Sequence, residues 1–71
     1  MSRLRAGADL GGTKIQTVVL GGRGKVHGEA REATPTSGGP EAVVKAIASA
    51  VREAADAAGV ETSSLIGVGV G

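Results

Sequence analysis

The chain has 71 residues, a formal net charge of +1, thirteen glycines, and no cysteine, phenylalanine, tyrosine or tryptophan. A chain of this length forms at most one small domain, which buries only about 60% of its unfolded surface. The near-zero charge and the lack of aromatic stacking platforms argue against nucleic-acid binding. No apolar run approaches the roughly 20 residues of a membrane span.

Two further expectations follow from the composition. The N-terminus has no signal-type apolar segment, so we expect a protein of the reducing cytoplasm. The apolar residues are small, and the chain has neither disulfides nor a cluster of metal ligands to reinforce its core. We therefore expect it to be a fragment that packs against further protein.

The first half of the chain predicts three strands joined by short turns. Small and apolar residues occupy 4–10, β-branched residues dominate 15–20, and apolar and polar residues alternate over 25–34, with Val26, Gly28 and Ala30 on one side. Such alternation indicates an antiparallel meander whose third strand has one solvent-exposed face. His27 falls on that face, where we interpret it as solvated because no catalytic partner stands nearby.

A helix is predicted to begin at Pro40 and to stop at Gly59. Its charged face carries pairs at i, i+4 spacing, such as Arg52 with Asp56, and we interpret it as solvated. Apolar residues recur at three- and four-residue steps and predict the buried face, namely Val43, Val44, Ile47, Val51, Ala54, Ala55 and Ala58.

The last segment, residues 65–71, alternates apolar residues with glycines and predicts a fourth strand. The helix is long enough to cross back over the sheet, so this strand should lie parallel to the first. Its row of glycines indicates either close packing by another element or a ligand that approaches the backbone. The sequence alone does not decide between the two.

The stretch between the first two strands has the chemistry of a phosphate site. It offers bare main chain that can take positive φ, a hydroxyl, a cation, and a carboxylate that can hold Mg²⁺. The residues are Asp9, Gly11, Gly12, Thr13 and Lys14. A plain hairpin turn would account for the two glycines but not for the polar residues around them. The spacing also differs from a P-loop, which has four residues between its glycines and ends in Lys-Ser/Thr.

The run Asp9-Leu10-Gly11-Gly12-Thr13-Lys14-Ile15 resembles the first phosphate motif of the ROK family of sugar kinases, within the actin and hexokinase superfamily. The run Gly67-Val68-Gly69-Val70-Gly71 is similar to the glycine-rich fourth strand of that family. The resemblance implies an α/β, RNase H-like half-domain of order β-β-β-α-β. Residues 1–71 would then be the N-terminal part of an actin-like ATPase and sugar kinase domain, truncated at its C-terminal end.

The resemblance also implies a chemistry, the transfer of the γ-phosphoryl group of ATP to a hexose hydroxyl, as in a glucokinase. Asp9 would organise Mg²⁺, directly or through water. Phosphates would be held by Gly11, Gly12, Thr13 and Lys14, and the sugar would lie near Gly69 and Gly71. The family's catalytic aspartate and its zinc motif lie further along than residue 71, so we expect the chain alone to be inactive. The resemblance separately implies a parent protein that is a homo-oligomer.

Two other functions are consistent with the sequence. Some ROK proteins are sugar-responsive transcription regulators, which carry a DNA-binding helix-turn-helix ahead of the first strand. Because Met1 lies only a few residues before that strand, we do not expect such a segment here. The other is a non-catalytic module that assembles through an exposed sheet edge.

Overall fold

The computed structural model describes residues 4–22 and 24–71. In this part of the chain four strands, one α-helix and a short 3₁₀ helix, η1, follow one another. Their bounds are β1 Leu4–Leu10, β2 Lys14–Leu20, β3 Val26–Ala33, α1 Gly39–Ala58, η1 Thr62–Ser64 and β4 Leu65–Val70. None of the described helices combines the length and hydrophobicity that crossing a bilayer requires.

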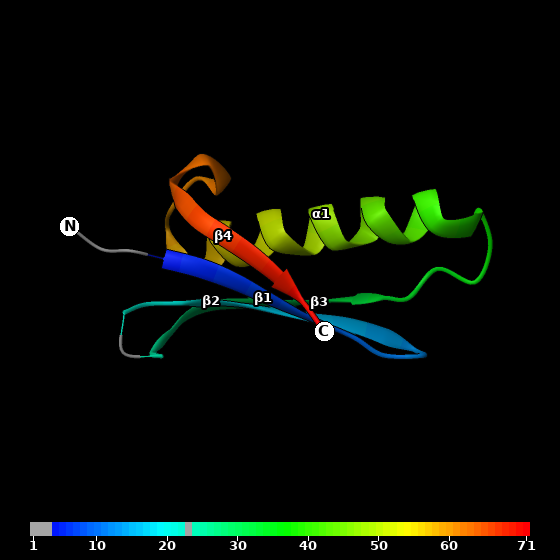
Figure 1. Cartoon of the computed structure of the whole chain (residues 1–71), viewed down its shortest axis with the longest axis horizontal. Coiled ribbons are helices and arrows are strands. Elements are labelled where there is room, and N and C mark those ends of the chain that lie inside the picture. Colours follow the sequence, from blue (N-terminus) through cyan, green and yellow to red (C-terminus); the bar gives the residue numbers. More distant parts are fainter. Residues whose placement is uncertain (1–3, 23) are drawn as a thin grey trace.

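The strands form one mixed sheet in the order β3-β2-β1-β4. β1 pairs antiparallel with β2, β2 pairs antiparallel with β3, and β4 returns beside β1 in the parallel sense. Figure 1 shows α1 running along one side of the sheet. The helix packs mainly on β3 and β2 and only marginally on β1. The predicted fold class and strand directions are confirmed.

The core lies between α1 and the sheet and is built from small side chains. Alternate strand residues point toward the helix, as period-two geometry requires, and Ile15, Thr17 and Val19 of β2 are completely buried. The other buried residues are Leu4, Ala6 and Ala8 of β1 and Ala50, Val51, Ala54 and Ala55 of α1. With no aromatic residue available, alanines let the two layers approach closely.

The buried face of α1 is shorter than the sequence periodicity suggests. Its fully buried residues all lie between Ala50 and Ala55, and Val44 is 64% exposed, so the prediction that Val44 belongs to the core is wrong. A 20-residue helix is about 30 Å long, whereas a seven-residue strand spans about 23 Å. Periodicity identifies the face of a helix but not how far the sheet below it extends.

The predicted end of α1 is confirmed in detail. Gly59 takes a left-handed conformation with φ 76°, which a residue with a side chain adopts less easily. Its N–H donates to the Asp56 carbonyl at 3.0 Å, and the N–H of Val60 donates to the Ala55 carbonyl at the same distance. These two bonds satisfy carbonyls that the last helical turn leaves free.

Strand β3 contains an irregularity that the sequence does not reveal. Val19 pairs with Gly28 but Leu20 pairs with Val26, so His27 is an extra residue at this point of the ladder. Val26 is consequently 50% exposed, so the prediction that it lies on the same side of the strand as Gly28 is wrong. The extra residue reverses the side to which Val26 points.

Gly28 sets the distance between α1 and the sheet. A Cβ atom built on Gly28 would lie 2.6 Å from the backbone nitrogen of Ala58 and closer still to the carbonyl oxygen of Ala54. Both neighbours are helix backbone, which cannot rotate away as a side chain could. A side chain at this position therefore requires the helix to move off the sheet.

We expect Gly28→Ala to lower the free energy of unfolding by about 2 kcal/mol, the cost of overpacking a tight core. Gly22→Ala is the matched control, because a Cβ there meets nothing within 4 Å. Denaturant titration of both variants measures the difference. Equal midpoints for the two would show that the helix does not rest on Gly28.

Candidate functional site

The side of the sheet away from α1, here called the open face, carries the residues singled out from the sequence. Since alternate residues of β1 and β2 point toward the helix, the remaining ones form this face. They are Arg5, Gly7 and Asp9 of β1 and Gln16, Val18 and Leu20 of β2. Together with β4 they line a hollow of about 930 Å³.

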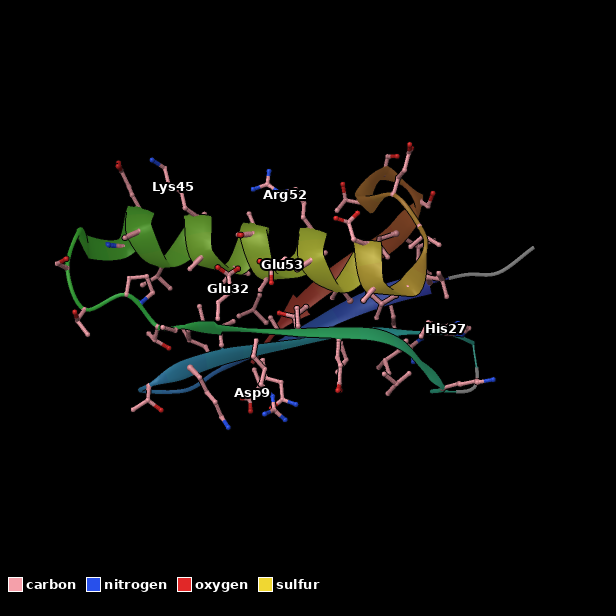
Figure 2. The ribbon with its side chains drawn as sticks, turned by 180° about the vertical axis from the view of Figure 1, so that it is seen from behind. Asp9, His27, Glu32, Lys45, Arg52 and Glu53 are labelled. Carbon is pink, nitrogen blue, oxygen red and sulfur yellow. The ribbon has the colours of Figure 1, made fainter. Side chains whose placement is uncertain are left out.

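Asp9 stands at the end of β1 with its side chain exposed on the open face, and Figure 2 shows it pointing away from α1. On one side it pairs with Gln16 of β2. On the other side the N–H of Gly71 donates to the Ala8 carbonyl and the N–H of Leu10 donates to the Gly71 carbonyl, both at 2.9 Å. Gly71 therefore lies directly beside Asp9 and leaves the space next to its carboxylate open.

The strand registers extend this arrangement into two rows across the open face. Paired residues of neighbouring strands point to the same side of a sheet. The first row is therefore polar and runs through Gly71, Asp9, Gln16 and Arg31. The second row runs through Gly69, Gly7, Val18 and Glu29. Gly7 of β1, Gly69 of β4 and Gly71 thus form a floor without side chains next to Asp9, the one carboxylate of the first row.

The bend between β1 and β2 follows Asp9 immediately. It is closed by a 3.0 Å hydrogen bond from the N–H of Gly11 to the carbonyl of Lys14. Neither Gly11 nor Gly12 takes a positive φ, so the expectation that the glycines serve this purpose is wrong. The chain reversal is spread over several residues, and no single one needs the left-handed conformation. A Cβ on Gly11 would instead lie 3.1 Å from the Lys14 carbonyl oxygen.

Two main-chain donors of the bend are free. Among the described residues, no recorded hydrogen bond uses the N–H of Gly12 or of Thr13, and both residues are exposed. Lys14 is also exposed and alternates with the buried Ile15, which places it on the same face as Gln16. The bend thus offers free amides, a hydroxyl and a cation, which are groups that can bind an anion, while the carboxylate of Asp9 close by would need a cation between itself and that anion.

Thr34, just beyond the end of β3, holds the bend from the other side. Its hydroxyl donates to the Gly11 carbonyl at 2.9 Å, and its N–H donates to the Thr13 carbonyl at 3.1 Å. Sequence reasoning missed this residue, because the contact depends on where β3 ends relative to a bend 23 positions earlier. Gln16 and Arg31 were missed for the same reason, since only strand register places them in a row with Asp9.

A metal at this site would depend mainly on Asp9. In residues 4–22 and 24–71 no group of three or more histidine, cysteine, aspartate or glutamate side chains could hold an ion. A single exposed carboxylate next to open space suits Mg²⁺, which usually keeps several waters and takes further oxygens from a phosphate. His27 takes no part in this site, because it lies near the other end of the sheet (Figure 2). Its ring lies against Gly21.

The sheet order and the glycine-lined open face define the RNase H-like half-domain that the sequence predicted. The model of the ROK family matches residues 5–71. The match covers almost the whole sequence, and the chain belongs to the ROK family.

Solved structures of ROK kinases resemble the chain over nearly all of its length. One is a ROK family glucokinase from Streptomyces griseus in complex with glucose and AMPPNP, with 35% identity over 96% of this chain and a TM-score of 0.79. Another is a ROK hexokinase from Thermus thermophilus, with 36% identity over 94% of this chain and a TM-score of 0.82. The chain spans only 20% and 22% of the lengths of these two proteins.

A more distant likeness concerns the fold alone. A nucleotide-free diol dehydratase-reactivating factor aligns with 96% of this chain and 12% of its own length at a TM-score of 0.77, with 24% identity. No curated protein matches the sequence.

The glycine floor gives a stability test that needs no ligand. A Cβ on Gly69 meets nothing within 4 Å, unlike one on Gly28. We expect Gly69→Ala to change the free energy of unfolding by less than about 0.5 kcal/mol, as at a surface position. A loss comparable to that of Gly28→Ala in the same denaturant titration would mean that another element packs on this glycine.

Proposed function

We propose that the chain is the N-terminal, phosphate-binding part of an ATP-dependent sugar kinase that phosphorylates a hexose hydroxyl, as a glucokinase does. The observation that carries the proposal is the position of Asp9, exposed between Gly71 and a bend with free amides. Membership of the ROK family and the likeness to a glucokinase in complex with glucose and AMPPNP support the same function.

In this proposal Asp9 holds Mg²⁺, through water or directly. The bound ion would neutralise part of the charge on the phosphates of ATP. The position of Asp9 suits this role, because Gly71 has no side chain that would compete for the space beside the carboxylate. The neighbouring amide of Gln16 can hydrogen-bond the carboxylate or a water next to it.

The bend supplies the contacts to the nucleotide phosphates. The free N–H groups of Gly12 and Thr13 donate to phosphate oxygens, and the Thr13 hydroxyl adds a third donor. Lys14 contributes a positive charge on the same face as Asp9. Because phosphoryl transfer requires positioning and charge stabilisation more than covalent chemistry by the protein, fixed donors of this kind are what the reaction needs.

The hexose lies on the floor formed by Gly69 and Gly71, close enough for its hydroxyl to face the phosphate. A sugar ring needs room near the main chain, and glycine is the residue that provides it. The general base that takes the hydroxyl proton comes from outside these 71 residues. Without it the chain alone has no kinase activity.

The first test replaces the carboxylate in the full-length protein that carries this chain. We expect Asp9→Asn to lower kcat/KM for ATP-dependent hexose phosphorylation by roughly a hundredfold or more, because the metal loses its anionic ligand. Asp56→Asn is the matched control, since Asp56 is exposed on α1. Steady-state assays at saturating Mg²⁺ measure the effect, and unchanged turnover in the Asp9 variant would refute the proposal.

The second test distinguishes the proposed sugar site from the nucleotide site. We expect Gly69→Val to raise the KM for hexose about tenfold or more, since isopropyl bulk would occupy the sugar floor, while the KM for ATP stays near that of the wild type. A variant with unchanged hexose KM would show that the sugar binds elsewhere. Denaturant titration of the same preparation checks that the fold is intact.

A further inference from the structure

Thr34 makes two hydrogen bonds to the bend, and they differ in what they depend on. The bond from its backbone N–H to the Thr13 carbonyl, 3.1 Å long, forms with any residue except proline. The bond from its hydroxyl to the Gly11 carbonyl, 2.9 Å long, requires a serine or threonine at this position. The first continues the pairing of β2 with β3, while the second is a specific side-chain contact.

The hydroxyl bond fixes the direction of an amide that it does not touch. The carbonyl of Gly11 and the N–H of Gly12 belong to one planar trans peptide, in which they point in opposite directions. Holding the carbonyl toward Thr34 therefore turns the Gly12 N–H away from Thr34. This N–H is one of the two free donors among the described residues of the bend.

The glycines make this constraint necessary. The peptide between Gly11 and Gly12 is flanked by two residues with little steric preference, so its plane can turn over more easily than one between residues with side chains. The Thr34 hydroxyl removes that freedom before a ligand arrives. A donor that is oriented in advance costs less conformational entropy when it binds an anion. Hydrogen bonding to the carbonyl also polarises the same peptide and strengthens its N–H as a donor.

We infer that Thr34 is a positioning residue for the nucleotide phosphates. Its hydroxyl holds the Gly11–Gly12 peptide in the orientation in which the Gly12 N–H faces the phosphates of the nucleotide. The inference rests on the proposed kinase function. In this arrangement the Thr34 hydroxyl does not donate to the nucleotide, because its proton is already donated to the Gly11 carbonyl.

The test compares three variants of the full-length protein. Thr34→Val keeps the shape and the backbone bond but removes the hydroxyl, and Thr34→Ser restores the hydroxyl. Thr36→Val makes the same chemical change at an exposed residue of the same loop and is the control. For each variant we measure the KM for MgATP, the KM for hexose, kcat, and hydrogen exchange of a peptide that covers residues 10–15.

We expect Thr34→Val to raise the KM for MgATP roughly two- to tenfold, the range for one partly exposed hydrogen bond. The KM for hexose should stay within twofold of wild type, and exchange in the bend should become faster. Thr34→Ser should restore the wild-type KM for MgATP and the wild-type rate of exchange in the bend. Thr36→Val should match wild type in both. A role in stability alone would instead reduce the active fraction and lower kcat without changing the KM for MgATP.

Failure of this inference differs from failure of the proposed function. If the wild-type protein is active and Thr34→Val has the same KM for MgATP as Thr36→Val, the positioning role is wrong while the kinase function stands. If the wild-type protein neither phosphorylates a hexose nor binds MgATP, the proposed function and the positioning role are both wrong.

Discussion

Two main-chain hydrogen bonds between β1 and the residue that follows β4 bring Asp9 and the glycine-rich end of the chain together. The bonds join Gly71 to Ala8 and to Leu10, so the glycine-rich strand ends directly beside Asp9. Asp9 and Gly71, which are 62 positions apart in sequence, thus become neighbours. Without the parallel return of β4, Asp9 would stand at the sheet edge with no floor beside it. The site therefore depends on α1, which carries the chain back to start β4 next to β1.

The two faces of the sheet separate the structural role from the proposed functional one. The face toward α1 holds a compact core of alanines, valines, a leucine, an isoleucine and a threonine, which Gly28 allows to pack tightly. The open face holds the polar row, the glycine floor and the free amides of the bend. Because successive strand residues alternate between faces, one short sequence such as β2 contributes to the core and to the site at once.

Much of the fold could be predicted from local patterns, because these patterns act over short distances. β-Branched residues indicated β2, and Gly59 indicated the end of α1, as the structure confirms. Features that depend on how elements meet could not be predicted. The exposure of Val44 reflects the length of the sheet below the helix, and that of Val26 reflects the extra residue at His27. Thr34 could be recognised only once the end of β3 lay beside the bend.

Strand β3 connects the packing of α1 on the sheet with the bend between β1 and β2. Near one end Gly28 packs against the backbone of α1. Just past the other end Thr34 donates hydrogen bonds to the carbonyls of Gly11 and Thr13. The strand between them is paired along its length with β2 and cannot stretch. Inserting or deleting one residue between Gly28 and Thr34 would therefore shift one of these two contacts out of place relative to the other.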